Sequence, residues 1–318
     1  MQIPITNPIV AAIDAAHEAR PESPRAHLGA SLLGHHCDRY LWLSFRWVNP
    51  ERFSGRMLRL FRRGQLEEAT VISDLRAIGC NITATELDTG HQQRVDFGCH
   101  VSGSVDGVIN GGLPTAPNKP HVLEIKTHNK KSFDALEKGG VAKVKPMHFT
   151  QMQVYMLGLG IDRALYIAVC KDDDRLYAER VRLDREHATK AVERGHRIAT
   201  ADNMPEPCPG AGPSWYLCKF CPHYGLCWGK DKPEAKPQCR ACGYSTAKPD
   251  STWQCEKWQA KIPLDAQREG CTEFVLHPEL VPWPLDDTQS TCAVAAYVID
   301  GRIVKNGPGA IASKELVI

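Results

Sequence analysis

The fold class of this chain is decided by two short stretches, GSVDGVI at residues 103–109 and HVLEIKT at residues 121–127. A Gly/Pro-rich turn separates them, and their β-branched residues predict neighbouring strands. Side chains alternate between the two faces of a strand, so Glu124 and Lys126 point the same way while Ile125 points into the core. We therefore expect the adjacent strand to place the Asp106 carboxylate beside that of Glu124.

Two carboxylates and a lysine on one sheet face predict a site for a divalent cation and a phosphate. Carboxylate oxygens are ligands that Mg²⁺ prefers, and the ammonium of Lys126 can face an anion or a water. Further ligands are needed, and the predicted helix at 55–78 supplies Glu68 or, as the weaker candidate, Glu67. The competing interpretation is an exposed strand face with one ion pair between Glu124 and Lys126.

The composition is that of a soluble globular protein. The chain has 318 residues, of which 24% are charged and 42% hydrophobic, and its net charge of +2 requires any DNA-binding surface to be local. No apolar run is long enough to span a membrane, and the N-terminal stretch lacks the basic region of a signal peptide. Without a secretory signal, the thirteen cysteines favour metal ligation over disulfides, and we expect a cytoplasmic protein.

Periodicity and turn signals predict an α/β protein with a Cys-rich C-terminal part. Helices are expected at 7–18, 28–47, 55–78, 130–138, 146–158 and 185–200, and strands near 81–88, 94–110, 121–127, 164–170 and 176–184. The composition shifts toward Pro and Cys after about residue 201, and Lys230–Pro237 has the composition of a linker. We therefore place a large first domain at 1–230 and a small metal-binding domain at 231–318, which ends in a hairpin turning at Asp300-Gly301.

The helix at 146–158 carries a polar pair. Gln151 and Tyr155 are four residues apart and therefore lie on one helix face, where they can hydrogen-bond a phosphate or a water. The helix at 55–78 begins with a run of arginines, Arg52, Arg56, Arg59, Arg62 and Arg63. A phosphate-facing patch and an ordinary solvated helix face explain this run equally well.

Taken together, these residues resemble the PD-(D/E)XK nuclease superfamily, in particular its RecB/AddB-like exonuclease branch, over about residues 28–230. Val105-Asp106 stands at the position of the PD motif, without the proline, and Glu124-Ile125-Lys126 matches (D/E)XK. The branch's Gln-x-x-x-Tyr motif matches Gln151 to Tyr155, and its glycine followed four residues later by glutamate matches Gly64 and Glu68. The motifs stand in the family's order, which favours this interpretation over the exposed ion pair.

The resemblance implies a mixed central sheet flanked by helices, as in restriction endonucleases, and phosphodiester hydrolysis with Mg²⁺ or Mn²⁺. The residues that would hold the metal are Glu68, Asp106, Glu124 and the carbonyl of Ile125. Lys126 would orient or help deprotonate the attacking water and offset developing charge. Gln151 and Tyr155 would complete the catalytic set.

A first group of cysteines follows the nuclease motifs. Cys218, Cys221 and Cys227 supply three thiolates from one loop, and Cys37 is the best remote candidate for a fourth. One cysteine before the motifs and three after them resembles the iron–sulfur nucleases of the AddB type and the CRISPR-adaptation exonucleases. The resemblance implies a [4Fe–4S] cluster that ties the two ends of the nuclease domain together.

A second group lies beyond the linker, where Cys239, Cys242, Cys255 and Cys271 predict a structural zinc site, with His277 as a substitute for Cys271. In a rival partition, Cys218, Cys221, Cys239 and Cys242 form a zinc ribbon. We prefer two separate sites because that partition uses every clustered cysteine. The remaining cysteines, Cys80, Cys99, Cys170, Cys208 and Cys292, are expected in the core, and His100 and His148 are expected to be structural.

The leading functional hypothesis is a metal-dependent DNA exonuclease with an iron–sulfur cluster. The pattern resembles phage-encoded members of the family, which implies processing of linear DNA ends in the host cytoplasm during recombination or replication, with a single-strand annealing recombinase as a possible partner. One alternative is a non-catalytic iron–sulfur/zinc DNA-binding or redox-sensing module. Another is a structure-specific endonuclease. No membrane partner is expected.

Overall fold

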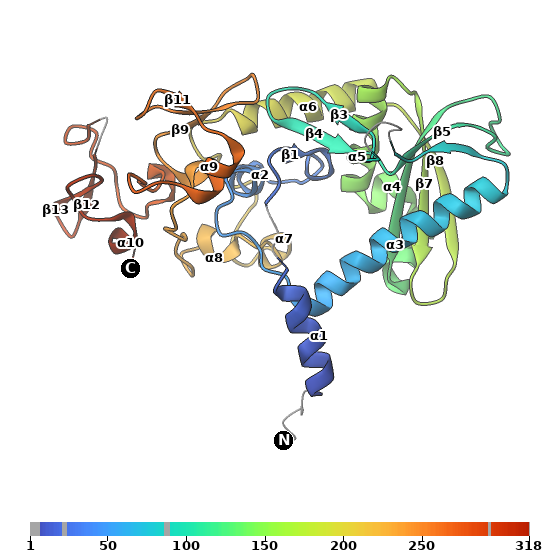
Figure 1. The fold of residues 1–318 in the computed structure, drawn as a ribbon, viewed down its shortest axis with the longest axis horizontal. Coiled ribbons are helices and arrows are strands. Elements are labelled where there is room, and N and C mark those ends of the chain that lie inside the picture. Colours follow the sequence, from blue (N-terminus) through green and yellow to red (C-terminus); the bar gives the residue numbers. More distant parts are fainter. Residues whose placement is uncertain (1–6, 21–23, 86–89, 292–293, 318) are drawn as a thin grey trace.

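The computed structural model describes residues 7–20, 24–85, 90–291 and 294–317. The helices are α1 (Pro8–Glu18), α2 (Asp38–Phe45), α3 (Gly55–Ala77), α4 (Lys130–Val144), α5 (Pro146–Leu159), α6 (Arg185–Ala199), α7 (Tyr216–Lys219), α8 (Tyr224–Cys227), α9 (Leu264–Glu269) and α10 (Ser313–Leu316). Strands and helices are mixed along the chain, as expected for an α/β protein (Figure 1). Within the described residues, no helix is both long and apolar enough to cross a membrane.

A five-stranded mixed sheet forms the centre of the structure. Its order is β2 (Asn81–Thr83), β5 (Gly107–Gly111), β6 (His121–His128), β7 (Arg163–Cys170) and β8 (Leu176–Arg182). Strands β6 and β7 are parallel, and every other neighbouring pair is antiparallel. A parallel pair requires a crossover between its strands, and α4 and α5 provide it. The strands and helices predicted between residues 121 and 200 are therefore confirmed, apart from their ends and the greater length of α4.

Helix α3 covers one face of this sheet mainly with its C-terminal half. Val71, Ile72 and Leu75 are buried there against sheet residues that include Ile109 and Ile125. The N-terminal half extends beyond the sheet and meets α1, and Figure 1 shows this part of α3 leaving the body of the protein. Helices α4 and α5 cover the opposite face. Helices thus cover both faces of the sheet, and the first turns of α3 extend beyond it.

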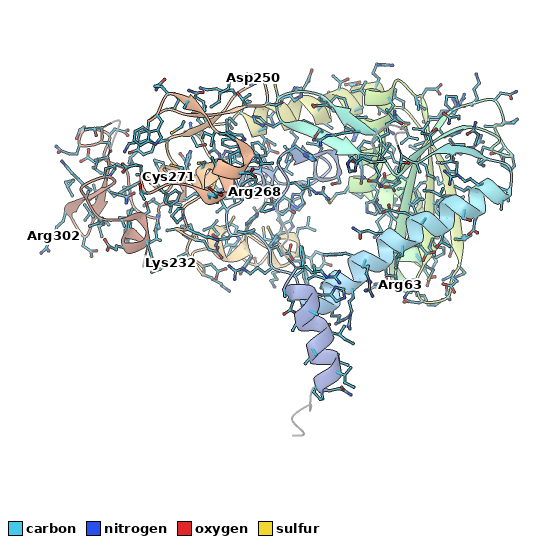
Figure 2. All side chains as sticks on the ribbon, in the orientation of Figure 1. Arg63, Lys232, Asp250, Arg268, Cys271 and Arg302 are labelled. Carbon is cyan, nitrogen blue, oxygen red and sulfur yellow. The ribbon has the colours of Figure 1, made fainter. Side chains whose placement is uncertain are left out.

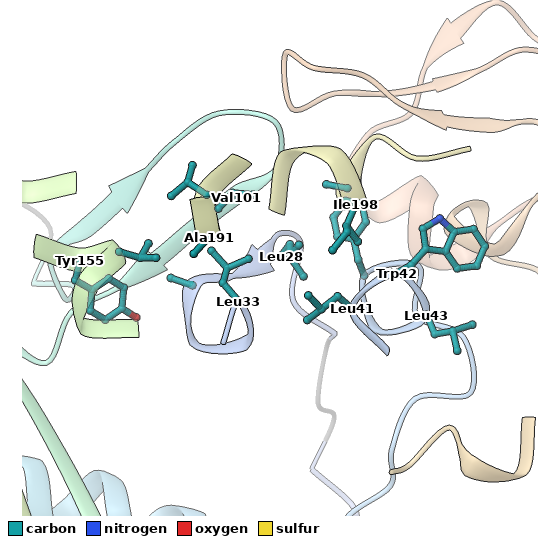
Figure 3. Close-up of a cluster of buried hydrophobic side chains, with 14 of the residues drawn as sticks. Leu28, Leu33, Leu41, Trp42, Leu43, Val101, Tyr155, Ala191 and Ile198 are labelled. Carbon is teal, nitrogen blue, oxygen red and sulfur yellow. The ribbon is translucent and has the colours of Figure 1, made fainter. Parts of the chain in front are cut away.

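A second buried region lies between α2, α5, α6 and a small sheet. This sheet has the order β1 (Leu28–Gly29), β4 (Val101–Ser104) and β3 (Arg94–Asp96). Figure 3 shows its cluster of apolar side chains, which extends from Tyr155 at one end through Leu33 and Ile198 to Trp42. The same cluster continues into the C-terminal segment through Trp253 and Leu276. The two predicted domains therefore share one core, and their boundary at residue 230 stays a prediction.

The helix predicted over 28–47 is wrong in its first half. Residues 28–29 form β1, which pairs in parallel with β4, and a short 3₁₀ turn (Ala30–Leu32) follows before α2 begins at Asp38. Gly34 packs so closely on Met147 that a Cβ would lie 2.6 Å from its Cα. Tertiary pairing and this close contact override the helical pattern of the sequence.

The C-terminal segment is built from short elements. A three-stranded sheet contains β9 (Ser245–Ala247), β10 (Trp253–Cys255) and β11 (Ala260–Lys261), and a hairpin joins β12 (Ala295–Ile299) to β13 (Arg302–Asn306). The predicted turn is confirmed, because Asp300 and Gly301 both have positive φ, at 48° and 73°. Cys292 and residues 86–88 of the strand predicted near 81–88 lie outside the described residues.

Two buried arginines join the C-terminal segment to α2. Arg240 donates to the carbonyls of Phe45 at 3.0 Å and Ala26 at 2.7 Å, and its guanidinium lies 4.0 Å from the Trp47 ring centre. Arg46 donates in return to the carbonyl of Arg240 at 3.2 Å. Burial lowers the pKa of Arg240 to about 9 and that of Arg46 to about 10, which reflects the cost of placing these cations in the core.

Replacing Arg240 should weaken the whole fold. Arg240→Met keeps the length of the side chain but leaves buried carbonyls unpaired, and we expect the free energy of unfolding to fall by about 3 kcal/mol. Urea unfolding followed by tryptophan fluorescence measures this change. Arg302→Met, at an exposed position of β13, is the matched control and should change stability by less than about 0.5 kcal/mol. Equal losses in both variants would contradict a joining role for Arg240.

Candidate active site

Asp106 occupies the bend immediately before β5, beside the centre of β6. The antiparallel pairing of Gly107 with Leu123 brings this bend next to Glu124 and Ile125. Asp106 Oδ2 accepts a hydrogen bond of 2.8 Å from the backbone nitrogen of Ile125. The carboxylate is therefore held against the strand that carries the other two motif residues.

Glu124 is completely buried, and its charge is met by one cation. The Lys126 ammonium contacts Glu124 Oε1, lies 4.0 Å from Asp106 Oδ2 and donates to the Ile125 carbonyl at 3.3 Å. Among the described residues, Glu124 Oε2 has no hydrogen-bond partner. The exposed ion pair considered above is therefore not what the structure contains, because Glu124 has no exposed surface.

The carboxyl groups here outnumber their compensating cation. Burial raises the pKa of Glu124 to about 8, and the neighbouring Asp106 and Glu68 carboxylates add to the shift against Lys126. Burial followed by the Asp106 charge raises the pKa of Glu68 to about 7, and burial also raises the pKa of Asp106. Burial alone would lower the pKa of Lys126, but Glu124 and Asp106 outweigh it and raise the value. The site favours a bound proton or a further cation.

Gln151 and Tyr155 come to the same site from α5. Gln151 Nε2 donates to the Tyr155 hydroxyl at 3.2 Å, and both side chains are buried. The Tyr155 ring reaches this position only because residue 103 is glycine. A Cβ on Gly103 would lie 2.8 Å from Tyr155 Cε1, 3.0 Å from its hydroxyl and 2.9 Å from the Cβ of Ala30.

One cavity of about 600 Å³ collects these residues. Its lining includes Glu68, Asp106, Lys126, Gln151 and Tyr155, whereas Glu124 lies behind it. The predicted residues from α3, β6 and α5 therefore meet, and Glu67 is not among the lining residues.

Sequence reasoning missed several polar residues of this cavity, which are Arg25, His27, Ser31, Gln65 and Gln92. Arg25 donates to Ser31 Oγ at 3.2 Å, and Gln92 donates to Glu68 Oε2 at 3.4 Å. Most of them lie in loops or short turns, where no periodic pattern points to a common face. Gln65 alone could have been predicted from the sequence, because it precedes Glu68 by three residues on α3 and therefore lies on the same helix face.

The two histidines predicted to be structural have structural contacts. His148 Nδ1 lies 2.8 Å from the Tyr166 hydroxyl, which also lies 2.9 Å from His128 Nε2. His100 is buried and packs on Phe45 with a ring separation of 5.3 Å.

The first cysteine group gathers around a small cavity at the start of α2. Its lining includes Cys37, Cys218, Cys221 and Cys227. Burial, together with the nearby Cys227, Cys37 and Cys218 thiols, raises the pKa of Cys221 to about 11.

Cys208 belongs to the same lining and is only half-buried, so its expected place in the core is wrong. Burial and the adjacent Cys37 thiol raise the pKa of Cys208 to about 11. Cys208 belongs to no Cys-x-x-Cys pair, so the sequence did not indicate that it lies beside the first cysteine group. Of the other cysteines expected in the core, Cys80 and Cys170 are buried, whereas Cys99 is half-buried.

The second group lies in the C-terminal segment. After burial, the neighbouring Cys242, Cys271 and Cys255 thiols raise the pKa of Cys239 to about 12. His277 does not join them, because its ring packs edge-on against Trp42 at 5.4 Å. The cysteines of the rival zinc ribbon thus fall into two separate neighbourhoods.

Neither the carboxyl groups of the cavity nor the two cysteine groups form a complete metal-coordination sphere. Within the described residues, no three His, Cys, Asp or Glu side chains stand in an arrangement that could hold a metal ion. The carboxyl and thiol groups are gathered, but any metal would require their side chains to converge further.

Comparisons with known proteins identify no family for this chain. No protein-family model matches it, and a search of curated proteins finds no match. A crystal structure of the protein SSO0001 is 17% identical over 73% of this chain and 100% of its own, with a TM-score of 0.38. The alkaline exonuclease LHK-Exo from Laribacter hongkongensis is 17% identical over 59% of this chain and 90% of its own, with a TM-score of 0.36. Its complex with dAMP gives 18% identity, the same coverage and a TM-score of 0.36. TM-scores at this level support no functional conclusion.

The close approach of Tyr155 to β4 predicts a measurable coupling. Gly103→Ala should cost about 1–3 kcal/mol in the free energy of unfolding, because its methyl group overlaps the Tyr155 ring. Combining it with Tyr155→Leu should recover part of that cost in urea unfolding. Gly212→Ala is the control, since a Cβ there meets no atom within 4 Å. An identical cost of Gly103→Ala with and without the ring would disprove the contact.

Proposed function

We propose that this chain is a metal-dependent deoxyribonuclease that acts as an exonuclease. The observation that carries the proposal is the arrangement of Asp106, Glu124 and Lys126 on adjoining backbone segments. Lys126 Nζ lies 4.0 Å from one carboxylate and in contact with the other. Glu68, Gln151 and Tyr155 line the cavity in front of them. This set of groups suits the hydrolysis of a phosphodiester.

The donor set fits Mg²⁺ or Mn²⁺. Glu68, Asp106, Glu124 and the Ile125 carbonyl are hard oxygen donors, and Glu124 Oε2 is buried without a hydrogen bond in the described part of the chain. The raised pKa values of Glu68 and Glu124 support an additional positive charge here. Such a cation supplies an activated water and stabilises charge on a phosphate.

The chain's own side chains supply the rest. Lys126 keeps its proton, so its ammonium stabilises negative charge that develops on the phosphate. The Tyr155 hydroxyl is fixed by Gln151 and lines the cavity, where it donates a hydrogen bond to a phosphate oxygen or a water. Because burial and the nearby Glu124 carboxylate raise the pKa of Tyr155, it stays a donor rather than a base.

We also propose a [4Fe–4S] cluster at Cys37, Cys218, Cys221 and Cys227, and a zinc ion at Cys239, Cys242, Cys255 and Cys271. The nearness of the thiols within each group supports both assignments. A cluster at the first group would close a loop of about 180 residues around the active site, and closing a long loop restricts the unfolded chain strongly.

The non-catalytic alternative is disfavoured by the burial of Glu124. A binding module has no use for a carboxylate that is fully buried at the cost of its hydration. The structure-specific endonuclease is left as an outcome of the assay below. A single-strand annealing recombinase as partner and a phage context rest on the family resemblance and stay predictions.

Hydrolysis of DNA is the first test. Purified protein with Mg²⁺ or Mn²⁺ should degrade end-labelled linear DNA and leave covalently closed circles intact. Asp106→Asn preserves the size of the side chain and an oxygen for the Ile125 amide, yet should lower the rate more than about 100-fold. The control is Asp250→Asn at an exposed turn. Wild-type rates in Asp106→Asn would end the proposal, and cleavage of closed circles would indicate an endonuclease.

Metal content tests the cysteine assignments. Protein purified without oxygen should be brown and hold about four iron atoms per chain. Cys37→Ser should lose that iron, whereas Cys208→Ser, which alters the adjacent thiol, and the buried Cys80→Ser should retain it. Cys255→Ser should lose zinc and keep iron. If Cys208→Ser loses the iron and Cys37→Ser does not, the ligand set has been assigned wrongly.

A further inference from the structure

A second cavity, of about 900 Å³, adjoins the candidate active site along α3. The two cavities share Arg25 and Gln65 in their linings. This second cavity, which we call the α3 groove, is lined by Leu58, Phe61 and Gln65. These residues belong to the part of α3 that extends toward α1 in Figure 1. A ligand in the active site can therefore continue into the α3 groove without leaving the surface.

The α3 groove contains an aromatic pair. Phe53 and Phe61 meet edge to face, with ring centres 4.9 Å apart and planes at 85°. Phe61 is 41% exposed although it is one of the largest apolar side chains on α3. In an edge-to-face pair, one ring keeps both faces uncovered by its partner, so the groove offers a flat apolar surface to a planar ligand.

Positive charge surrounds this pair. Arg20, Arg25 and Arg52 line the same groove. Arg52 pairs with Glu234 at 3.3 Å, but its side chain is 83% exposed and such a pair holds weakly, so it can exchange for a phosphate. Arg20 has no acidic residue within ion-pair distance in the described part of the chain.

The two acidic residues of the α3 groove, Glu18 and Glu51, offset only part of this charge, because three arginines line the same groove. The Glu18 carboxylate is held in place by the backbone, because its Oε1 accepts a hydrogen bond of 2.6 Å from the Gly55 nitrogen. Close by, Arg20, Arg62 and Arg59 add to the effect of burial and lower the pKa of His17. Arg20 follows the end of α1, whereas Arg59 and Arg62 belong to α3 and do not line the groove, so the groove itself owes its positive charge to Arg20, Arg25 and Arg52.

The spacing along α3 relates the groove to the reactive position. Leu58, Phe61, Gln65 and Glu68 recur at intervals of three and four residues and therefore share one helix face. With a rise of 1.5 Å per residue, Phe61 lies about 10 Å before Glu68. Stacked nucleotides of one strand advance about 3.4 Å each, so this distance corresponds to about three nucleotides.

We propose that the α3 groove binds a single, unpaired nucleic-acid strand about three nucleotides from the phosphate that is cut. Phe53 and Phe61 stack on its bases, and Arg20, Arg25 and Arg52 bind its phosphates. The strand is unpaired because a ring can take a base face only where that face is free of its neighbours in a duplex. This inference rests on the proposed nuclease function and adds the form of its substrate.

Binding of labelled oligonucleotides tests the α3 groove directly. The probes are a 20-nucleotide oligothymidylate and a blunt hairpin duplex, each 5′-fluorescein-labelled and followed by fluorescence anisotropy in EDTA so that no cleavage occurs. Phe61→Ala should weaken binding of oligothymidylate about fivefold or more, and Phe53→Ala/Phe61→Ala should weaken it further. Duplex binding should stay within about twofold of the wild type. Trp258→Ala, which removes an exposed ring far along the chain, is the control.

A purely structural role for Phe61 is excluded by conservative variants. Phe61→Leu keeps apolar volume without a stacking face and should bind as poorly as Phe61→Ala, whereas Phe61→Trp should bind as the wild type does. If Phe61→Leu restores binding, the ring serves only to pack α3 and the proposal is overturned. Equal losses for oligothymidylate and duplex would overturn the single-strand assignment.

A further assay distinguishes a wrong strand-binding proposal from a wrong nuclease proposal. With metal present, the Phe53→Ala/Phe61→Ala variant should hydrolyse a thymidine dinucleotide as the wild type does and a 20-mer more slowly. Wild-type rates on both substrates would refute the α3 groove and leave the nuclease standing. An intact anisotropy difference without any hydrolysis by the wild type would refute the nuclease and leave strand binding standing.

Discussion

The burial of Glu124 beside Lys126 is the constraint on which the rest of the site depends. A carboxylate with no exposed surface must be compensated locally, and one ammonium does this for three carboxyl groups. The Asp106 carboxylate is partly stabilised by the hydrogen bond that it accepts from the Ile125 amide. What is left is a surplus of negative charge facing a cavity, and this surplus makes a cation, rather than another anion, the expected occupant.

Helix α3 connects this charge to the α3 groove. Its C-terminal half is anchored by Val71, Ile72 and Leu75 on the sheet, so Glu68 stands at a defined height above β6. Its N-terminal half carries Phe61 and several arginines, and Figure 2 labels one of them, Arg63, which donates to the Lys171 carbonyl at 3.0 Å. One rigid element thus places the carboxylate proposed to bind metal and the surface proposed to bind a strand at a defined spacing, which a loop would not maintain.

Much of the fold was predictable from the sequence because its main elements are long and strongly patterned. α3, α5, α6 and strands β6 to β8 lie within a few residues of their predicted bounds, and Glu68, Asp106, Lys126, Gln151 and Tyr155 do share one cavity. The helix predicted from residue 28 was wrong because β1 pairs with β4, a partner more than 70 positions away. Cys208 was misplaced because its neighbour Cys37 is even more remote in the chain.

By itself, the sequence determined which groups are available for chemistry and on which strand or helix face each lies, because the periods of strands and helices are local properties. Only the tertiary structure decided how deeply Glu124 is buried, that Arg25 and Gln65 join the active site to the α3 groove, and that the cysteines divide into two neighbourhoods. These features depend on contacts between residues far apart in the chain, and no local pattern encodes the distance between them.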